Sequence, residues 1–193
     1  EDRIELDGGQ MGRFMTTRYG DTGASLVPAA TEWTALLGDV SVDTFHPAVA
    51  RAAIEAGAAI INDTTGLRDP QMADVVADSE ARIVIAHSLA TPRTQHPLPH
   101  YDDVTAEVGA FLRQRSDLAL ERGIPAERII IDPGHDLNKN TLQTLEITRH
   151  LDDIAAIGYP LLVALSNKDF IGESLGRERH ERAALLEVDA GRL

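Results

Sequence analysis

Polar side chains stand at the ends of several short apolar runs in this sequence. Three of them are Asp43, Asn62 and Asp132. Asp63 follows Asn62 directly, and Lys168 lies just beyond a further apolar run. A carboxylate accepts two parallel N–H bonds from an amidine-like edge, an amide both donates and accepts, and a lysine reaches a ring nitrogen or carbonyl. Gathered at one place, the set predicts a site for a planar heterocycle. The alternative is that such residues cap the next helix.

A lysine and a histidine are further candidates. Lys139 directly precedes a predicted helix that begins near Thr141. A helix N-terminus with a lysine can hold an anion, and a solvated lysine stays equally open. His87 ends another apolar run and could act as an acid, a base or a hydrogen-bonding wall residue, although a core histidine is the commoner outcome.

The apolar runs are nearly continuous, which is typical of parallel strands covered on both faces. They are Val40–Asp43, Ala59–Asp63, Ile83–His87, Ile129–Asp132 and Leu161–Leu165. Between them, helical spacing and glycine stops predict helices that begin near Pro47, Gln71, Asp103 and Thr141, the last continuing to Gly158.

Alternating strands and helices predict βαβ units around a parallel sheet. We favour an α/β fold of the (β/α)₈ TIM barrel type, because a barrel collects polar strand ends around one mouth. An open doubly wound sheet more often has a glycine-rich first turn, and the sequence contains no such motif. We expect residues 1–193 to form a single domain. A barrel takes about 250 residues, so a chain of 193 residues with five placed strands predicts an incomplete barrel.

Composition excludes several classes of protein. The formal net charge of −13 disfavours nonspecific binding to nucleic acid or to an anionic membrane. The absence of cysteine excludes a disulfide scaffold, a thiol nucleophile and a thiolate metal site, and it fits a reducing compartment. No apolar run approaches the roughly 18 residues of a membrane span. We therefore expect a cytoplasmic protein without nucleic-acid or membrane partners.

Four ordered segments resemble the motifs of the dihydropteroate synthase family. They are Val40–Phe45, Gly57–Asp63, Ile130–Gly134 and Ser166–Gly172. The resemblance implies a TIM-barrel transferase of folate biosynthesis, usually a homodimer. Such an enzyme condenses 6-hydroxymethyl-dihydropterin diphosphate with p-aminobenzoate and releases pyrophosphate, with Mg²⁺ assisting. The resemblance assigns pterin binding to Asp43, Asn62, Asp132 and Lys168.

Two substitutions depart from the family pattern. The family's Ser-Arg-Lys-Ser-Phe is replaced by Ser166–Phe170, in which Asn167 and Asp169 are the differences. The serine after the lysine helps to hold the carboxylate of p-aminobenzoate in the family, so Asp169 would set a second carboxylate against it. Ser166, Asp169 and Lys139 are thus the candidates for an acceptor or anion site.

A third departure replaces the family's glycine-rich stretch after Asp-Pro-Gly with His135–Asn138. With these changes the chain is most similar to the divergent second synthase homologue of actinobacteria. Three functions stay open. They are a synthase-type transferase with altered acceptor use, a catalytically silent pterin-binding module, and a folate-binding methyltransfer domain.

Overall fold

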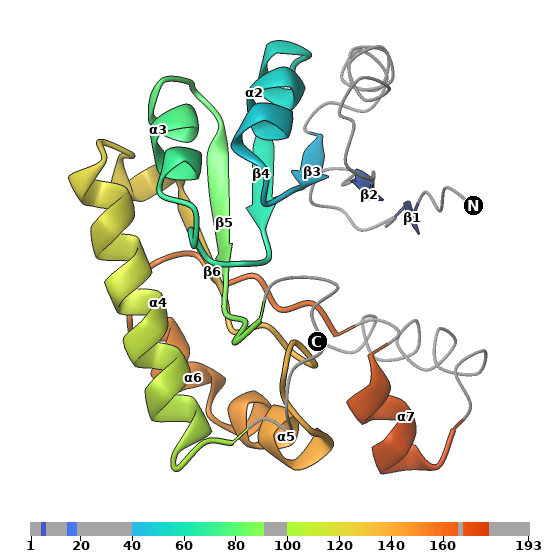
Figure 1. Cartoon of the computed structure of the whole chain (residues 1–193). Coiled ribbons are helices and arrows are strands. Elements are labelled where there is room, and N and C mark those ends of the chain that lie inside the picture. The colour runs from blue at the N-terminus through green and yellow to red at the C-terminus, as the bar shows by residue number, and fades with distance from the viewer. Residues whose placement is uncertain (1–4, 7–14, 19–39, 91–99, 166–167, 178–193) are drawn as a thin grey trace.

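A six-stranded sheet organises the part of the chain that the computed structural model describes, residues 5–6, 15–18, 40–90, 100–165 and 168–177 (Figure 1). The strands are β1 (Glu5–Leu6), β2 (Met15–Arg18), β3 (Ser41–Asp43), β4 (Ile60–Asp63), β5 (Arg82–Ala86) and β6 (Ile129–Asp132). They lie side by side in the order of the sequence; β1 and β2 are antiparallel, and each later pair is parallel. A doubly wound sheet reverses its order at a switch point. The unreversed order is that of a barrel wall, as predicted.

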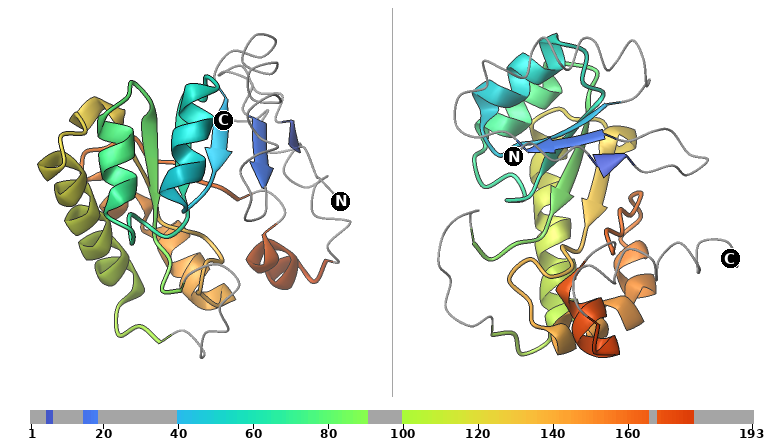
Figure 2. Two further views of the ribbon diagram at one scale, coloured as in Figure 1. Left: turned by 45° about the horizontal axis from the view of Figure 1, so that its top comes forward. Right: turned by 90° about the vertical axis from the view of Figure 1, so that its right-hand side faces the viewer.

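The helices follow the strands. They are α2 (Pro47–Glu55), α3 (Gln71–Ala77), α4 (Val104–Glu121), α5 (Thr141–Arg149), α6 (Leu151–Ala155) and α7 (Asp169–Leu175), with a short 3₁₀ turn at Ala126–Arg128. Figures 1 and 2 show α2, α3 and α4 along one face of the sheet, and α5 beside α7 beyond the carboxyl ends of the strands. Among the described residues, no helix is long and apolar enough to cross a membrane.

Local sequence accounts for most of these elements. Pro47 occupies the first turn of α2, where its fixed φ and missing N–H cost nothing. The Asp103 side chain caps α4 by accepting a 2.9 Å hydrogen bond from the backbone N of Ala106. β3, β4 and β6 fall within predicted apolar runs, and β5 begins one residue before its run, so the prediction of parallel strands is confirmed for these four.

The single helix predicted from Thr141 to Gly158 is wrong, because the chain breaks at His150 into α5 and α6. His150 has φ −112° and ψ 34°, outside the helical region, and it ends one helix and precedes the other. The buried residues of the two helices are Thr144, Ile147 and Ile154, whereas Leu142 is 77% exposed. Packing of Ile147 and Ile154 onto the core requires a change of direction that apolar spacing alone did not show.

The strand predicted at Leu161–Leu165 forms only in part. Leu161 makes one isolated parallel bridge to Ile131. Its two hydrogen bonds run from the N of Ile131 to the O of Pro160 at 2.9 Å and from the N of Leu162 to the O of Ile131 at 2.8 Å. No strand among the described residues pairs with the other edge of this segment. With one neighbour, the segment stays extended and pairs at a single residue.

The core lies between the sheet and its helices. Val42, Ile61, Ile83 and Ile129 occupy equivalent register positions on β3, β4, β5 and β6, and all four are buried. They belong to one apolar cluster with Val108 and Leu112 of α4 and with Ile147 and Ile154. Side chains alternate between the two faces of a strand, so the residue that follows each of these points to the opposite face.

Candidate functional site

The strand register puts three of the predicted site residues on one face of the sheet. Asp43 lies directly beside Asn62 across β3 and β4. Asn62 pairs with Val84 on β5, and Ala86, two residues further along β5, pairs with Asp132 on β6. Because side chains alternate, all five share the face opposite the helix-packed core. Asp43, Asn62 and Asp132 therefore stand at the carboxyl ends of their strands, with the small side chains of Val84 and Ala86 between.

Asp43 orients the amide of Asn62. The Nδ2 atom of Asn62 donates a 2.7 Å hydrogen bond to the Oδ1 atom of Asp43. This contact fixes which end of the amide faces Asp43 and turns the carbonyl oxygen away. The Oδ1 atom of Asn62 is buried and has no hydrogen-bond partner among the described residues. A buried acceptor without a partner costs about 1–3 kcal/mol, so this atom is a candidate for contact with a ligand.

Asp132 is a buried carboxyl group that experiences the charges of two lysines. Burial raises its pKa, whereas a 2.7 Å hydrogen bond from the backbone N of Gly134 and the charges of Lys168 and Lys139 oppose the rise. A ligand that donated N–H groups to this carboxylate would stabilise its ionised form in the same way. Asp132 thus suits the recognition of a cationic or amidine-like edge.

Asp63 has a structural role instead. Its carboxylate accepts hydrogen bonds from the N and Oγ1 atoms of Thr65, at 2.8 and 2.7 Å, and from the N of Leu67 at 2.9 Å. Leu67 has a positive φ of 56°, which these bonds support. Asp63 therefore stabilises the turn after β4 and does not cap the next helix, α3, whose N-cap is Pro70, whereas its neighbour Asn62 faces the other side of the sheet.

Lys139 lies buried beneath the turn that follows β6. Its Nζ atom donates to the carbonyl oxygens of Gly134 and Leu137, at 2.9 and 3.1 Å, and lies 2.9 Å from Nδ1 of His87. The start of α5 is closed by a capping box between Asn140 and Gln143. The alternative of a solvated lysine is wrong, and these contacts give no support to an anion site at this helix start.

Burial shifts the proton equilibria around Lys139. It lowers the pKa of Lys139 to about 7, an effect that the charge of Asp132 opposes. Burial and the charge of Lys139 together lower the pKa of His87 to about 3. His87 is therefore neutral near pH 7 and accepts from the lysine. Its ring also packs edge-on against Phe111, with centroids 4.8 Å apart, so His87 is a core histidine.

Gly134 is required by the close approach of this turn to β5. Its φ is +68°, and a Cβ atom at this position would lie 2.0 Å from the carbonyl oxygen of His87. Backbone atoms cannot yield to such a contact, so the glycine of the Asp-Pro-Gly segment has a steric basis.

His135 is buried without a polar partner. Only 1% of its surface is exposed, and neither ring nitrogen has a hydrogen-bond partner among the described residues. The ring stacks on Phe170 of α7, with centroids 6.0 Å apart and an interplanar angle of 29°. Burial, followed by the charges of Lys139 and Lys168, lowers the pKa of His135 to about 4. Sequence reasoning gave this histidine no role in the site.

Asp136 and Asn138 are the two non-glycine residues with positive φ in this turn, at 61° and 52°. Asn138 accepts through Oδ1 from Oγ of Ser88 at 2.7 Å and from the N of Ala90 at 3.0 Å. Aspartate and asparagine tolerate the left-handed region better than other non-glycine residues. Their occurrence where the family has glycine was the signal in the sequence for this conformation.

The remaining candidates surround the start of α7. Lys168 has extended backbone immediately before the helix, and Asp169 is its exposed first residue. The charge of Lys168 opposes the rise in the pKa of Asp132. Ser166 and Asn167 lie outside the described residues. The predicted binding roles of all these side chains stay predictions.

Among the hollows of the described part of the chain, two lie near the strands. One of about 380 Å³ opens between the loops after β3 and β4 and is lined in part by Phe45, His46 and Arg68. The larger, about 580 Å³, lies at the amino ends of β4 and β5 and contains none of the strand-end residues. The smaller hollow is formed by loops at the carboxyl ends of the strands, and its lining also contains none of the predicted site residues.

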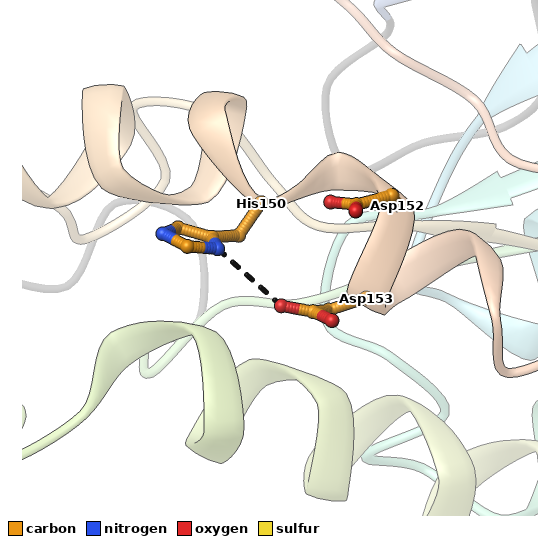
Figure 3. A group of neighbouring side chains, drawn as sticks. All are labelled: His150, Asp152 and Asp153. Carbon is orange, nitrogen blue, oxygen red and sulfur yellow. Dashed lines mark ion pairs between the residues drawn. The ribbon is translucent and has the colours of Figure 1, made fainter.

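A separate group of side chains lies at the junction of α5 and α6 (Figure 3). Nε2 of His150 is 3.2 Å from Oε1 of Glu146, and Nδ1 is 3.4 Å from Oδ2 of Asp153. Asp152 is close enough to complete a three-residue set that could hold an ion. The carboxylates are exposed, and exposed ion pairs contribute little to stability. We treat the group as surface ion pairs.

Fold and site together define an α/β-barrel protein with a polar ligand site at the carboxyl ends of its strands. A family model described as "Pterin binding enzyme" matches residues 24–190. The chain belongs to this pterin-binding family, and its fold is that of a TIM barrel, present here in part.

Named relatives agree with this assignment. The "Inactive dihydropteroate synthase 2" of Mycobacterium tuberculosis is 43% identical over 148 residues, which cover 74% of this chain and 46% of the relative. The "Dihydropteroate synthase" of a Synechocystis strain is 37% identical over 137 residues, 70% of this chain and 47% of the relative. The chain thus spans about half the length of these curated relatives.

Solved structures are similar over more of the chain. Dihydropteroate synthase from Xanthomonas albilineans in complex with 7,8-dihydropteroate has a TM-score of 0.75 and 41% identity, covering 82% of this chain and 60% of that one. The Thermus thermophilus enzyme in complex with 4-aminobenzoate has a TM-score of 0.77 and 38% identity, covering 81% and 61%. The predicted resemblance to dihydropteroate synthases is confirmed.

The two buried histidines allow a matched test. Replacing His135 with leucine should raise the free energy of unfolding by about 1 kcal/mol, because it removes two unpartnered polar atoms. His87→Leu should lower it by about 1–3 kcal/mol, because Lys139 then loses an acceptor. Urea unfolding near neutral pH measures both. Equal destabilisation by the two substitutions would contradict this account of His135.

The lowered pKa of Lys139 predicts that stability depends on pH. Its folded-state pKa of about 7 lies below the ordinary value of 10.5, so between these values the unfolded chain binds one more proton than the folded chain. The free energy of unfolding should therefore rise with pH across this window, and the contribution should disappear in Lys139→Met. Urea titrations at several pH values measure it. A rise of the same size in the variant would show that another group is responsible.

Proposed function

We propose that this chain binds a reduced pterin at the carboxyl ends of β3, β4 and β6, and that Asp169 prevents efficient use of p-aminobenzoate as the acceptor. The observation that carries the proposal is the carbonyl oxygen of Asn62. It is buried, turned away from Asp43 by the amide hydrogen bond, and unpartnered among the described residues. A ring N–H of the pterin would satisfy it.

Each end of the site suits a different part of the pterin. Asp132 would accept paired N–H bonds from the amidine-like edge, which favours its ionised form and opposes the effect of burial. Lys168, whose charge already acts on Asp132, would donate to a ring nitrogen or carbonyl oxygen. Val84 and Ala86 would lie beneath the ring, since their side chains are small, apolar and placed between Asn62 and Asp132.

Asp169 is the reason to expect weak acceptor use. It follows Lys168 directly and is exposed at the first position of α7. By the resemblance, the carboxylate of p-aminobenzoate would lie against this position, and two carboxylates repel each other most where water is excluded. The mycobacterial relative named as inactive supports the same interpretation.

An active dihydropteroate synthase is the second candidate. It is favoured by relatives that carry this name without qualification and by the similar structure that holds 7,8-dihydropteroate. In that case the amine of p-aminobenzoate would attack the exocyclic methylene of the pterin and displace pyrophosphate. The position of Asp169 favours the first candidate.

Magnesium, which the resemblance implies, does not fit the carboxylates of Asp63 and Asp132. Both oxygens of Asp63 accept hydrogen bonds from residues 65–67. Asp132 lies within the fields of Lys139 and Lys168, which would repel a divalent cation. We therefore derive no step through magnesium. A homodimer and a cytoplasmic location stay predictions.

Binding is tested by calorimetric titration with 6-hydroxymethyl-dihydropterin diphosphate. We expect saturable binding below millimolar concentration. Asn62→Ala should weaken it about tenfold, because one or two hydrogen bonds are lost. Gln114→Ala, at an exposed position of α4, is the matched control and should bind as the unmodified chain does. Absence of saturable binding by the unmodified chain would overturn the proposal.

Acceptor use is tested by pyrophosphate release in the presence of p-aminobenzoate. The unmodified chain should show little or no acceptor-dependent release, and Asp169→Ser should increase it by relieving the repulsion. Glu173→Gln, a charge removal at an exposed position further along α7, is the control. Robust turnover by the unmodified chain would favour the active synthase, and silence of Asp169→Ser with intact pterin binding would favour a binding module.

A further inference from the structure

The turn after β6 holds α7 through a side chain that lies far from it in sequence. Oδ2 of Asp136 accepts hydrogen bonds from the backbone N of Asp169 at 2.5 Å and from the N of Phe170 at 3.3 Å. Oδ1 lies 3.4 Å from Oγ1 of Thr144, which donates to it from α5. The carboxylate thus caps the first turn of α7 and ties it to the start of α5. The helix dipole also favours a negative charge at the N-terminus of a helix.

The backbone at Asp136 commits the side chain to this contact. Its φ of 61° lies in the left-handed region, where a non-glycine residue needs compensation. Asn138, also left-handed, fixes the other end of the turn through Ser88 and Ala90. Asp136 therefore projects from a turn held to β5, so it provides a fixed point for α7.

Two further contacts join the same elements. His135 stacks on Phe170, and Oγ1 of Thr141 donates a hydrogen bond to Oε2 of Glu173. Neither contact reaches the first backbone N–H groups of α7. The hydrogen bond to Asp136 acts directly on the backbone of Asp169.

Lys168 is the residue immediately before this restrained peptide. Its backbone is extended, with φ −78° and ψ 149°, and its own N–H donates to the O of Leu165 at 3.3 Å. Holding the N–H of Asp169 fixes the peptide plane that joins it to Lys168, and so fixes the direction in which the lysine side chain leaves the backbone. The lysine charge then falls where Asp132 and His135 both experience it.

We propose that Asp136 is a positioning residue that sets Lys168 beside Asp132 and thereby sets the affinity of the site for a pterin. The proposal rests on the proposed function. Asp136 itself does not touch the ligand and acts through Lys168. It belongs to the stretch that replaces the family's glycines, so this chain has gained a side-chain restraint on α7 where a glycine offers none.

A double-mutant cycle separates positioning from a general structural role. The affinity for 6-hydroxymethyl-dihydropterin diphosphate is measured for Asp136→Ala, Lys168→Met and the double variant. Asp136→Ala should weaken binding about tenfold, because Lys168, once displaced, would lose its charge-assisted hydrogen bond to the pterin. In the Lys168→Met background, Asp136→Ala should weaken binding little further. Equal losses in both backgrounds, or no loss from Asp136→Ala alone, would overturn the proposal.

Rescue and control variants complete the cycle. Asp136→Asn keeps an acceptor of the same size and should restore most of the affinity lost in Asp136→Ala. Asp152→Ala removes an acidic residue from the first turn of a different helix, α6, and should leave affinity unchanged. Failure of the asparagine variant to bind better than the alanine variant would contradict the capping role.

A second measurement does not depend on pterin binding. NMR titration of Asp132 reports the position of the Lys168 charge, which opposes the rise in its pKa. If Asp136→Ala releases Lys168, the pKa of Asp132 should move up. Loss of the Asp136 charge by itself would move it down, so the sign identifies the cause. If the unmodified chain binds no pterin, the proposed function fails. Separately, an unchanged or lowered pKa of Asp132 in Asp136→Ala would overturn the placement of Lys168 by Asp136.

Discussion

The parallel register of β3, β4, β5 and β6 is the constraint on which the rest of this structure depends. Residues of neighbouring strands stand level with one another, so one set of alternate positions supplies Val42, Ile61 and Ile83 to the helix-packed core. The other set supplies Asn62 and Asp132 to the opposite face. A slip of one residue would exchange the two sets. Core and candidate site are therefore products of the same pairing.

The turn after β6 carries the buried charges that this arrangement needs. Lys139 stays in the interior because carbonyl oxygens of its own turn and Nδ1 of His87 surround its ammonium group. Buried polar groups are nearly always paired in this way. Apart from Thr105, Arg115 and Ser116 on α4, the exceptions among the described residues are Asn62 Oδ1 and the ring of His135. Both lie at the carboxyl end of the sheet, where functional strain is commonly found.

The departures from the synthase pattern are physically connected. Asp136 stands in the stretch where the family has glycine, and Asp169 stands where the family has serine. In this structure the carboxylate of Asp136 holds the backbone N–H of Asp169, although 33 residues separate them. The altered turn and the altered start of α7 form one unit.

Local patterns in the sequence determined β3 to β6, the helix α4 with its cap Asp103, and the strand-end polar residues, because period, β-branching and capping act over a few neighbouring residues. They did not show that Asn62 and Asp63 face opposite sides, with one available to a ligand and the other capping a turn. Nor did they show the break at His150, the burial of Lys139 or the contact of Asp136 with α7. Those features were decided by the tertiary structure, because each depends on the register of the sheet or on packing between segments that are distant in the sequence.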